Sequence, residues 1–244
     1  MAGSIANYRN MVEQPWGKMF YEQIFAQLPL PEDNRLKVLD FGAGFCITSE
    51  HYAKFHDVIA VEPNEEMYSV RFEGDYTLIT KGIEFLSEIA DNTYDVVICH
   101  NVLEYVDDMD AILKELGRVL KSSGKLSVIK HNIYGRALAS AVFGDDPKAS
   151  LDLLNGESED SMFGNRDVYP NEYLTGFFSG EMELENVYGI RAFFGLSKNN
   201  EIKYTEDWYN SMLELENKAS SMDEYKKIAF FNHLIFSKNL VNRI

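Results

Sequence analysis

The sequence predicts an α/β fold in which helices cover both faces of a mostly parallel sheet. Short apolar runs, each long enough for one buried strand, alternate with stretches of helical periodicity as far as residue 130. The clearest unit runs from Leu36 to Glu62 and reads as strand, tight glycine turn, helix and second strand. With 244 residues, 45% of them hydrophobic, the chain is long enough for one domain with an elaboration.

The other elements follow from the same periodicities. Strands are expected at 36–40, 57–61, 76–80, 94–100, 125–130, 184–193 and 228–237. Helices are expected at 18–27, 47–55, 111–120, 132–143, 173–178 and 208–218. Gly124 is expected to take the left-handed conformation that ends a helix. The sheet should therefore have seven strands.

Charge and cysteine content narrow the class of protein. The net charge of −16 argues against non-specific nucleic-acid binding, which depends on neutralising phosphates. Cys46 and Cys99 are expected to be reduced packing residues of an intracellular protein. No leader and no run of about 18 apolar residues is present, so we expect a soluble cytoplasmic protein without membrane contact. His51 and His56 lack further ligands at metal-binding spacing, so no metal is expected.

The turn after the first strand carries Asp40, Gly42 and Gly44. The glycines allow a sharp turn and leave room for a ligand. A dinucleotide site would need a third glycine where Ile47 stands, and Asp40 suits a positively charged ligand better than phosphates. Glu62 ends the second strand, where an acidic residue can hold both ribose hydroxyls. This pattern fits S-adenosylmethionine, which carries a sulfonium, an ammonium and a ribose but no phosphate.

The motif Asp40-Phe41-Gly42-Ala43-Gly44, with Glu62-Pro63-Asn64, resembles motif I and the acidic ribose-binding position of class I S-adenosylmethionine-dependent methyltransferases. The resemblance implies a Rossmann-like fold, S-adenosyl-L-methionine as the cofactor and a methyl acceptor as the second substrate. The residues that it implies at the cofactor are Asp40, Gly42, Ala43, Gly44, Glu62, Pro63, Met67, Gly82, Ile83, Glu84, His100 and Lys18.

Several of these residues are expected to lie together at the carboxyl ends of the strands. Ligands of open α/β sheets bind beyond the carboxyl ends of the strands, and Asp40, Glu62, Glu84 and His100 follow one strand each. In the resembled family the loop at 82–84 lies beside the adenine, although Glu84 is equally expected as an ordinary first-turn acid. His100 is expected as a cofactor or substrate contact, with packing and general-base roles as alternatives. No catalytic residue is assigned.

The resemblance also suggests how the chain is divided. Residues 1–35 form an N-terminal helical cap, 36–130 the cofactor-binding core, 131–170 a helical lid or insertion after the fifth strand, and 171–244 the rest of the same domain. The cap either covers a sheet edge or closes over the cofactor, where Lys18 or Arg9 would meet its carboxylate. The insertion either selects the substrate or is a surface excursion.

A narrower similarity concerns the acceptor. Several short patches are similar to the tRNA 5-carboxymethoxyuridine methyltransferase family, which methylates a carboxylate on a wobble uridine. These patches are 100–105, 132–135, 169–170, 189–193 and 212–216. The acceptor is therefore either a small metabolite or this carboxylate in tRNA, although the acidic insertion does not favour RNA. A nicotinamide-dependent oxidoreductase and a non-catalytic cofactor-binding module stay open as alternatives, and the oligomeric state is not predicted.

Overall fold

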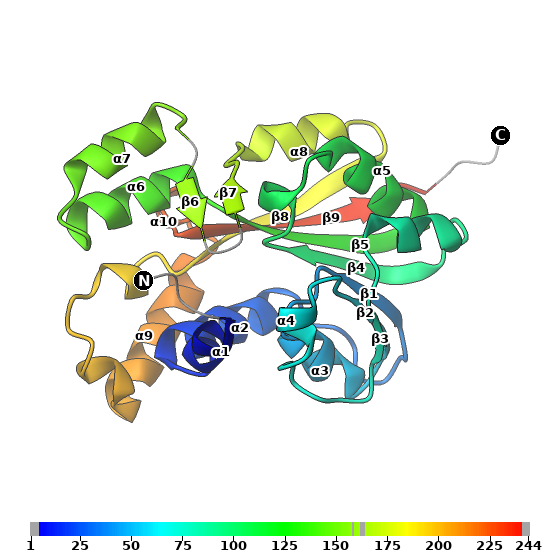
Figure 1. Cartoon of the computed structure of the whole chain (residues 1–244), viewed down its shortest axis with the longest axis horizontal. Helices are drawn as coiled ribbons and strands as arrows, with labels where there is room; N and C mark the ends of the chain where they lie inside the picture. Colours follow the sequence, from blue (N-terminus) through cyan, green and yellow to red (C-terminus); the bar gives the residue numbers. More distant parts are fainter. Residues whose placement is uncertain (1–4, 158, 162–163, 241–244) are drawn as a thin grey trace. The chain divides into compact units, whose positions relative to one another are not determined.

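The computed structural model describes residues 5–157, 159–161 and 164–240. Within this part, seven strands form one sheet in the order β3-β2-β1-β4-β5-β9-β8 (Figure 1). The strands are β1 (Lys37–Phe41), β2 (Asp57–Val61), β3 (Thr77–Ile79), β4 (Tyr94–His100), β5 (Leu120–His131), β8 (Met182–Ile190) and β9 (Phe231–Lys238). Strand β1 pairs in parallel with both β2 and β4, and β2 pairs in parallel with β3. The predicted seven-stranded, mostly parallel α/β sheet is confirmed.

The chain packs as two compact units. Unit 2 comprises residues 30–128, 171–186 and 234–244, and unit 1 comprises 1–29, 129–170 and 187–233. The helices of unit 2 are α3 (Ile47–Ala53), α4 (Glu65–Tyr68), η1 (Ile83–Glu88), η2 (Leu103–Tyr105), α5 (Met109–Val119) and α8 (Asn171–Phe177). Those of unit 1 are α1 (Ile5–Val12), α2 (Pro15–Gln27), α6 (Ile133–Val142), α7 (Pro147–Leu154), η3 (Phe194–Leu196), η4 (Ile202–Tyr204), α9 (Glu206–Ala219) and α10 (Asp223–Lys226).

The inner strands of unit 2 are buried on both faces. In β1 every side chain from Val38 to Phe41 is buried, as expected for a parallel strand with neighbours on both sides. Helix α5 buries one apolar stripe that includes Ile112, Leu113 and Leu116. Its N-terminus is capped by Asp108, whose side chain accepts a hydrogen bond from the N–H of Ala111 at 2.9 Å.

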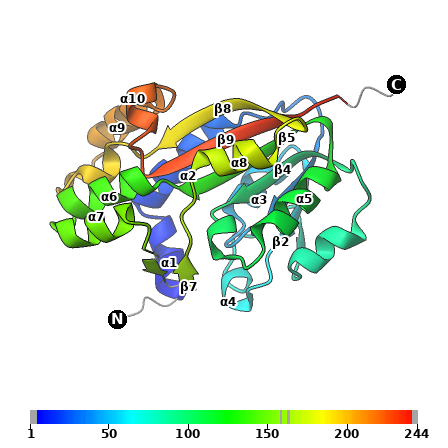
Figure 2. The ribbon, with the colours of Figure 1, turned by 90° about the horizontal axis from the view of Figure 1, so that it is seen from above.

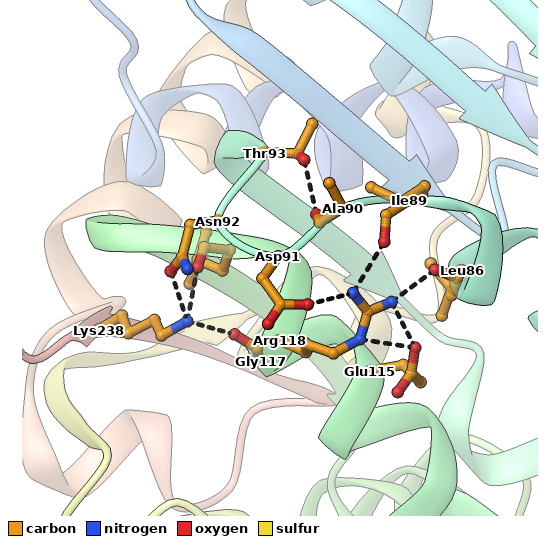
Figure 3. A network of polar contacts seen from close by, with 11 residues as sticks. Leu86, Ile89, Ala90, Asp91, Asn92, Thr93, Glu115, Gly117, Arg118 and Lys238 are labelled. Atoms are coloured by element: carbon orange, nitrogen blue, oxygen red, sulfur yellow. Dashed lines mark hydrogen bonds and ion pairs between the residues drawn. The ribbon is translucent and has the colours of Figure 1, made fainter.

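Arg118, near the end of α5, anchors the loop that leads into β4 (Figure 3). Its Nε and Nη2 donate to Glu115 Oε2 at 3.0 and 2.7 Å, and Nη2 also donates to the carbonyl of Leu86 at 2.7 Å. Its Nη1 donates to the carbonyl of Ile89 at 2.8 Å and to Asp91 Oδ1 at 2.6 Å. One planar guanidinium thus holds two backbone carbonyls and two carboxylates, which a lysine ammonium cannot reproduce.

The connection from α5 to β5 differs from the prediction. Ser123, and not Gly124, takes the left-handed conformation, with a φ of 62°. Residues 120–124 already belong to β5, which begins directly after the helix. Gly124 is needed for close approach instead, because a Cβ there would lie 2.8 Å from Leu120 Cδ1 and 2.9 Å from the carbonyl oxygen of Asp95.

Unit 1 contains elements that the sequence did not indicate. Helix α7 packs against α6 (Figure 2), and a short antiparallel strand pair, β6 (Glu159–Ser161) with β7 (Gly164–Arg166), follows. The predicted helix at 18–27 begins earlier, at Pro15, where proline suits the first helical position. The predicted segments 1–35, 131–170 and 171–244 each include residues outside the described part, and their roles as cap, lid and domain remainder stay predictions.

Candidate cofactor site

The carboxyl ends of the inner strands meet at one edge of the sheet in unit 2. Phe41 is in register with Val61, and Val61 with Ile79, so β1, β2 and β3 end together. Asp40 is in register with Ile98, two residues before the end of β4 at His100. The turn after β1 and Glu62 after β2 therefore lie at the edge where ligands of such sheets bind.

The turn after β1 is tight because three of its residues are left-handed. Gly42 has a φ of 76° and Gly44 a φ of 56°, and Cys46, with a φ of 59°, precedes α3. The N–H groups of Gly42 and Ala43 both donate to the carbonyl of Val61, at 2.8 and 2.9 Å. The predicted sharp glycine turn is confirmed, and it is fixed to the end of β2.

The space that a side chain at Gly42 would take is filled by packing, and contact of the turn backbone with the cofactor stays a prediction. A Cβ on Gly42 would lie 2.2 Å from Cγ2 of Val102, which follows β4. At Gly44 the nearest atom to a Cβ would be Cε of Met67, at 3.2 Å. The missing side chains thus let Val102 and Met67 pack against the turn.

Glu62 is held in place by the backbone around it. Its Oε2 accepts a hydrogen bond from the N–H of Gly44 at 2.7 Å, and its Oε1 accepts one from the N–H of Asn64 at 2.8 Å. Only 7% of Glu62 is exposed, and burial raises the pKa of its carboxyl while these two bonds lower it. Each carboxylate oxygen keeps a further acceptor direction, so Glu62 can accept two hydroxyl groups without giving up its backbone bonds.

Asp40 adds a second buried carboxylate. Ser49 Oγ donates to Asp40 Oδ2 at 2.6 Å, and burial raises the pKa of Asp40 to about 6, with Glu62 adding to the rise. Within the described part of the chain, no Lys, Arg or His forms an ion pair with Asp40 or Glu62. Two buried acids without a cation create a negative potential that favours a positively charged ligand, so these residues fit the sulfonium and ammonium of S-adenosylmethionine.

The residues expected beside adenine lie after β2 and β3. Glu84 is an exposed acid in the first turn of η1, and its Oε1 accepts a hydrogen bond from the N–H of Gly82 at 2.9 Å, which lowers the pKa of Glu84. Ile83 is 39% exposed at the start of η1. Pro63 is exposed and Met67 is 9% exposed. The ordinary first-turn role of Glu84 is therefore observed, and its contact with adenine stays a prediction.

His100 and Lys18 have partners of their own. His100 Nε2 lies 2.8 Å from Oγ of the fully buried Ser127. Lys18 belongs to α2 of unit 1, where its Nζ lies 3.8 Å from Glu22 Oε1 and 4.9 Å from the ring centroid of Tyr209. Arg9 is similarly paired with Glu13, at 2.9 Å.

Sequence reasoning missed Asn101, the residue after β4. Its φ of 54° is left-handed, a conformation that asparagine adopts more readily than most other non-glycine residues. Its Oδ1 is buried and accepts no hydrogen bond from any residue that the structure describes. The usable signal was its position at a strand end, immediately after His100.

Comparison with known proteins agrees with this geometry. Residues 39–128 match the family described as Methyltransferase domain. The chain is 31% identical over 182 residues to the ubiquinone biosynthesis O-methyltransferase of Xanthomonas oryzae pv. oryzae (strain PXO99A), an alignment that covers 69% of this chain and 73% of that protein. The fold of this chain is similar to that of an S-adenosylmethionine dependent methyltransferase from Mesorhizobium loti, with a TM-score of 0.56 and 16% identity, covering 90% of this chain and 97% of that one. It is also similar to the plantazolicin methyltransferase BpumL in complex with SAH, with a TM-score of 0.59, 16% identity, and coverage of 97% and 89%.

The chain belongs to the class I S-adenosylmethionine-dependent methyltransferases. It is an enzyme, and S-adenosylmethionine is its cofactor. This assignment excludes the oxidoreductase and the non-catalytic module that the sequence alone left open. The described residues contain no cluster of three or more potential metal ligands, and no described helix combines the length and apolar character of a membrane span.

Proposed function

We propose that the protein transfers the methyl group of S-adenosylmethionine to an oxygen atom of a small organic acceptor. The proposal is carried by the 31% identity to a protein named as an O-methyltransferase, over 69% of this chain. The net charge of −16 supports a small acceptor over tRNA, because RNA binding rests on neutralising phosphates.

In this proposal the strand edge of unit 2 binds the cofactor. Glu62 accepts the ribose hydroxyls with the acceptor capacity that its backbone bonds leave, and Asp40 faces the cationic end of the cofactor. The backbone of the turn at 42–44 supports the amino-acid part. Pro63, Met67 and the loop at 82–84 flank the adenine.

The cofactor supplies a methyl group that is already activated by the positive sulfur. The protein therefore has to align the acceptor with that group and exclude water. A hydroxyl acceptor must also lose a proton, and His100, Tyr8 and Tyr134 are the candidates to take it. A carboxylate acceptor needs no base.

A second acceptor, the carboxylate of a modified wobble uridine, is supported by the sequence patches at 100–105, 132–135 and 212–216. Methyl-labelled S-adenosylmethionine, incubated with the protein and with separate RNA and small-molecule extracts, distinguishes the two. We expect label in the small-molecule extract, on oxygen. Label that nuclease digestion releases from RNA would favour the second acceptor, and no label in either extract would contradict both.

A matched pair of variants shows that the transfer uses this site. Glu62→Gln should reduce the labelling rate at least tenfold, because an amide in that place offers one acceptor oxygen instead of two. Glu65→Gln removes an exposed acid from the neighbouring first turn of α4 and should leave the rate within twofold. Equal rates for the two variants would show that the ribose lies elsewhere.

A further inference from the structure

Unit 1 contains a guanidinium enclosed by aromatic rings. Arg191 follows β8 in the left-handed conformation, with a φ of 61°, and its N–H donates to Gln23 Oε1 at 3.0 Å. Four rings surround its guanidinium carbon. Their centroids lie at 5.2 Å (Phe230), 5.4 Å (Trp16), 5.6 Å (Phe194) and 5.9 Å (Phe231). Arg191 thus combines a left-handed backbone with a guanidinium that lies among four aromatic rings.

This cation has no acidic partner. Among the described residues no carboxylate lies within ion-pair distance of Arg191, and its buried Nε has no hydrogen-bond acceptor. Burial lowers the pKa of Arg191 to about 10, so the side chain is still charged at neutral pH. A half-buried guanidinium without an anion loses part of its hydration, and cation–π contacts offset only part of that cost.

Glu216 is a carboxylate whose charge raises the pKa of Arg191, but both Glu216 oxygens already accept backbone hydrogen bonds. Its Oε2 accepts the N–H of Ala192 at 2.8 Å, and its Oε1 accepts those of Phe193 and Phe194 at 2.9 and 2.7 Å. With 1% exposure, Glu216 is a buried anchor for the backbone just after Arg191. It holds the arginine segment in place and leaves the guanidinium edge without an oxygen acceptor.

A second cation shares one of the rings. Lys203, in η4, places its Nζ 4.8 Å from the ring centroid of Phe194 and 5.6 Å from that of Phe143. Only 8% of Lys203 is exposed, and its Nζ donates to the neutral side chain of Asn200 at 3.0 Å. Phe194 therefore contacts two cations, the half-buried Arg191 and the buried Lys203. In a chain with a net charge of −16, they form a local positive centre that stability alone does not require.

There is free space beside the guanidinium. A Cβ built on Gly195 would have one neighbour within 4 Å outside its adjacent residues, namely Arg191 Nη2 at 3.8 Å, in the part of the chain that the structure describes. The φ of Gly195 does not lie in the left-handed region, so a larger residue is compatible with its backbone. The glycine thus leaves a methyl-sized space next to Nη2.

We propose that Arg191, with Lys203 beside it, forms a binding site for the carboxylate of an aromatic organic anion. The planar guanidinium offers parallel N–H donors that match a carboxylate, and the surrounding rings suit an aromatic body. This site is built from unit 1 alone, so its occupation can be measured without S-adenosylmethionine and independently of methyl transfer.

The two tryptophans of the chain report on this site directly. Trp16 contacts Arg191, and Trp208 has its ring centroid 5.8 Å from that of Phe194. Titration of the wild-type protein with benzoate should change the tryptophan fluorescence saturably, whereas the neutral benzamide should not. Inorganic phosphate at equal ionic strength should give at least a tenfold weaker response.

Three variants test the charge of Arg191, the space beside its Nη2 and, as a control, an exposed cation elsewhere in unit 1. Arg191→Met and Gly195→Leu should each weaken benzoate binding at least tenfold, the first by removing the cation and the second by filling the space beside Nη2. Lys198→Met, which removes an exposed cation paired with Asp145 at 2.6 Å, should stay within twofold of wild type. Arg191→Met should unfold at the same urea concentration as wild type or a higher one, because an apolar side chain suits a buried place better than an unpaired charge.

The proposal is overturned by any of three results. They are no saturable response of the wild type to benzoate, equal responses to benzamide or phosphate, and wild-type benzoate affinity in Arg191→Met. If Arg191→Met does not fold, Gly195→Leu and Lys203→Met, which keep Arg191, are titrated in the same way. Wild-type benzoate affinity in both variants would then overturn the proposal.

Discussion

Gly42 offers a quantitative test of how the turn after β1 is built. Replacing it by alanine places a methyl group 2.2 Å from Val102 Cγ2, where about 3.5–4.0 Å is normal, on a backbone with a φ of 76°. The left-handed conformation costs about 1–2 kcal/mol for a residue with a Cβ. The overlap adds about 1–3 kcal/mol, as for other over-packed sites. We expect Gly42→Ala to lower the free energy of unfolding by about 2–5 kcal/mol.

A double-mutant cycle separates the two costs. Val102→Ala removes Cγ1 and Cγ2, the two atoms nearest to the new methyl group, and leaves Val102 Cβ at 3.3 Å. In the double variant the overlap should disappear while the backbone cost stays. The coupling between the two substitutions should therefore be favourable by about 1–3 kcal/mol.

Urea unfolding measured by far-ultraviolet circular dichroism supplies the four free energies, and tryptophan fluorescence from unit 1 tests whether the transitions coincide. A cost below about 1 kcal/mol for Gly42→Ala, or strictly additive effects, would refute the packing explanation for this glycine. The remaining explanation would then be that the space belongs to the cofactor.

Three further substitutions test other parts of unit 2. Burial raises the pKa of Asp40 from 3.8 to about 6, so between these pH values the folded state binds more protons than the unfolded state. Asp40 therefore makes the wild type less stable as the pH rises through that window. Asp40→Asn should remove this slope and add about 1–3 kcal/mol at pH 7 in urea titrations, and an unchanged slope would contradict the assignment. Arg118→Lys should cost about 2–3 kcal/mol and speed amide exchange at 86–92, because the carbonyls of Leu86 and Ile89 lose their shared donor. Ser123→Gly should gain about 0.5–1 kcal/mol by relieving its left-handed strain, and a loss measured by the same titration would show that the serine side chain matters more.

The sequence was sufficient for the fold because its local signals agree. The apolar runs of β1, β2 and β4 are bounded by turn residues, and their parallel arrangement follows from the helices between them. The elements it did not indicate are those that depend on distant contacts. Helix α7 packs against α6, and Gly124 lies close to the carbonyl oxygen of Asp95, in β4.

The site was predictable in position but not in detail. Strand order alone places Asp40, Glu62 and His100 at one edge of the sheet, and the structure has them there. That Glu62 is tied to the N–H of Gly44, or that Gly42 makes way for Val102, depends on three-dimensional packing that no sequence spacing encodes. The aromatic enclosure of Arg191 was equally invisible, because its four rings come from residues 16, 194, 230 and 231.

The most direct test is calorimetric titration of S-adenosylmethionine into the wild-type protein and into Glu62→Gln, with Glu65→Gln as the control. We predict saturable heat for the wild type, the same affinity within twofold for Glu65→Gln, and at least tenfold weaker binding for Glu62→Gln, with circular dichroism confirming that both variants are folded at the titration temperature. Full affinity in Glu62→Gln would contradict the cofactor site at the end of β2, and no heat with the wild type would contradict the use of this cofactor altogether.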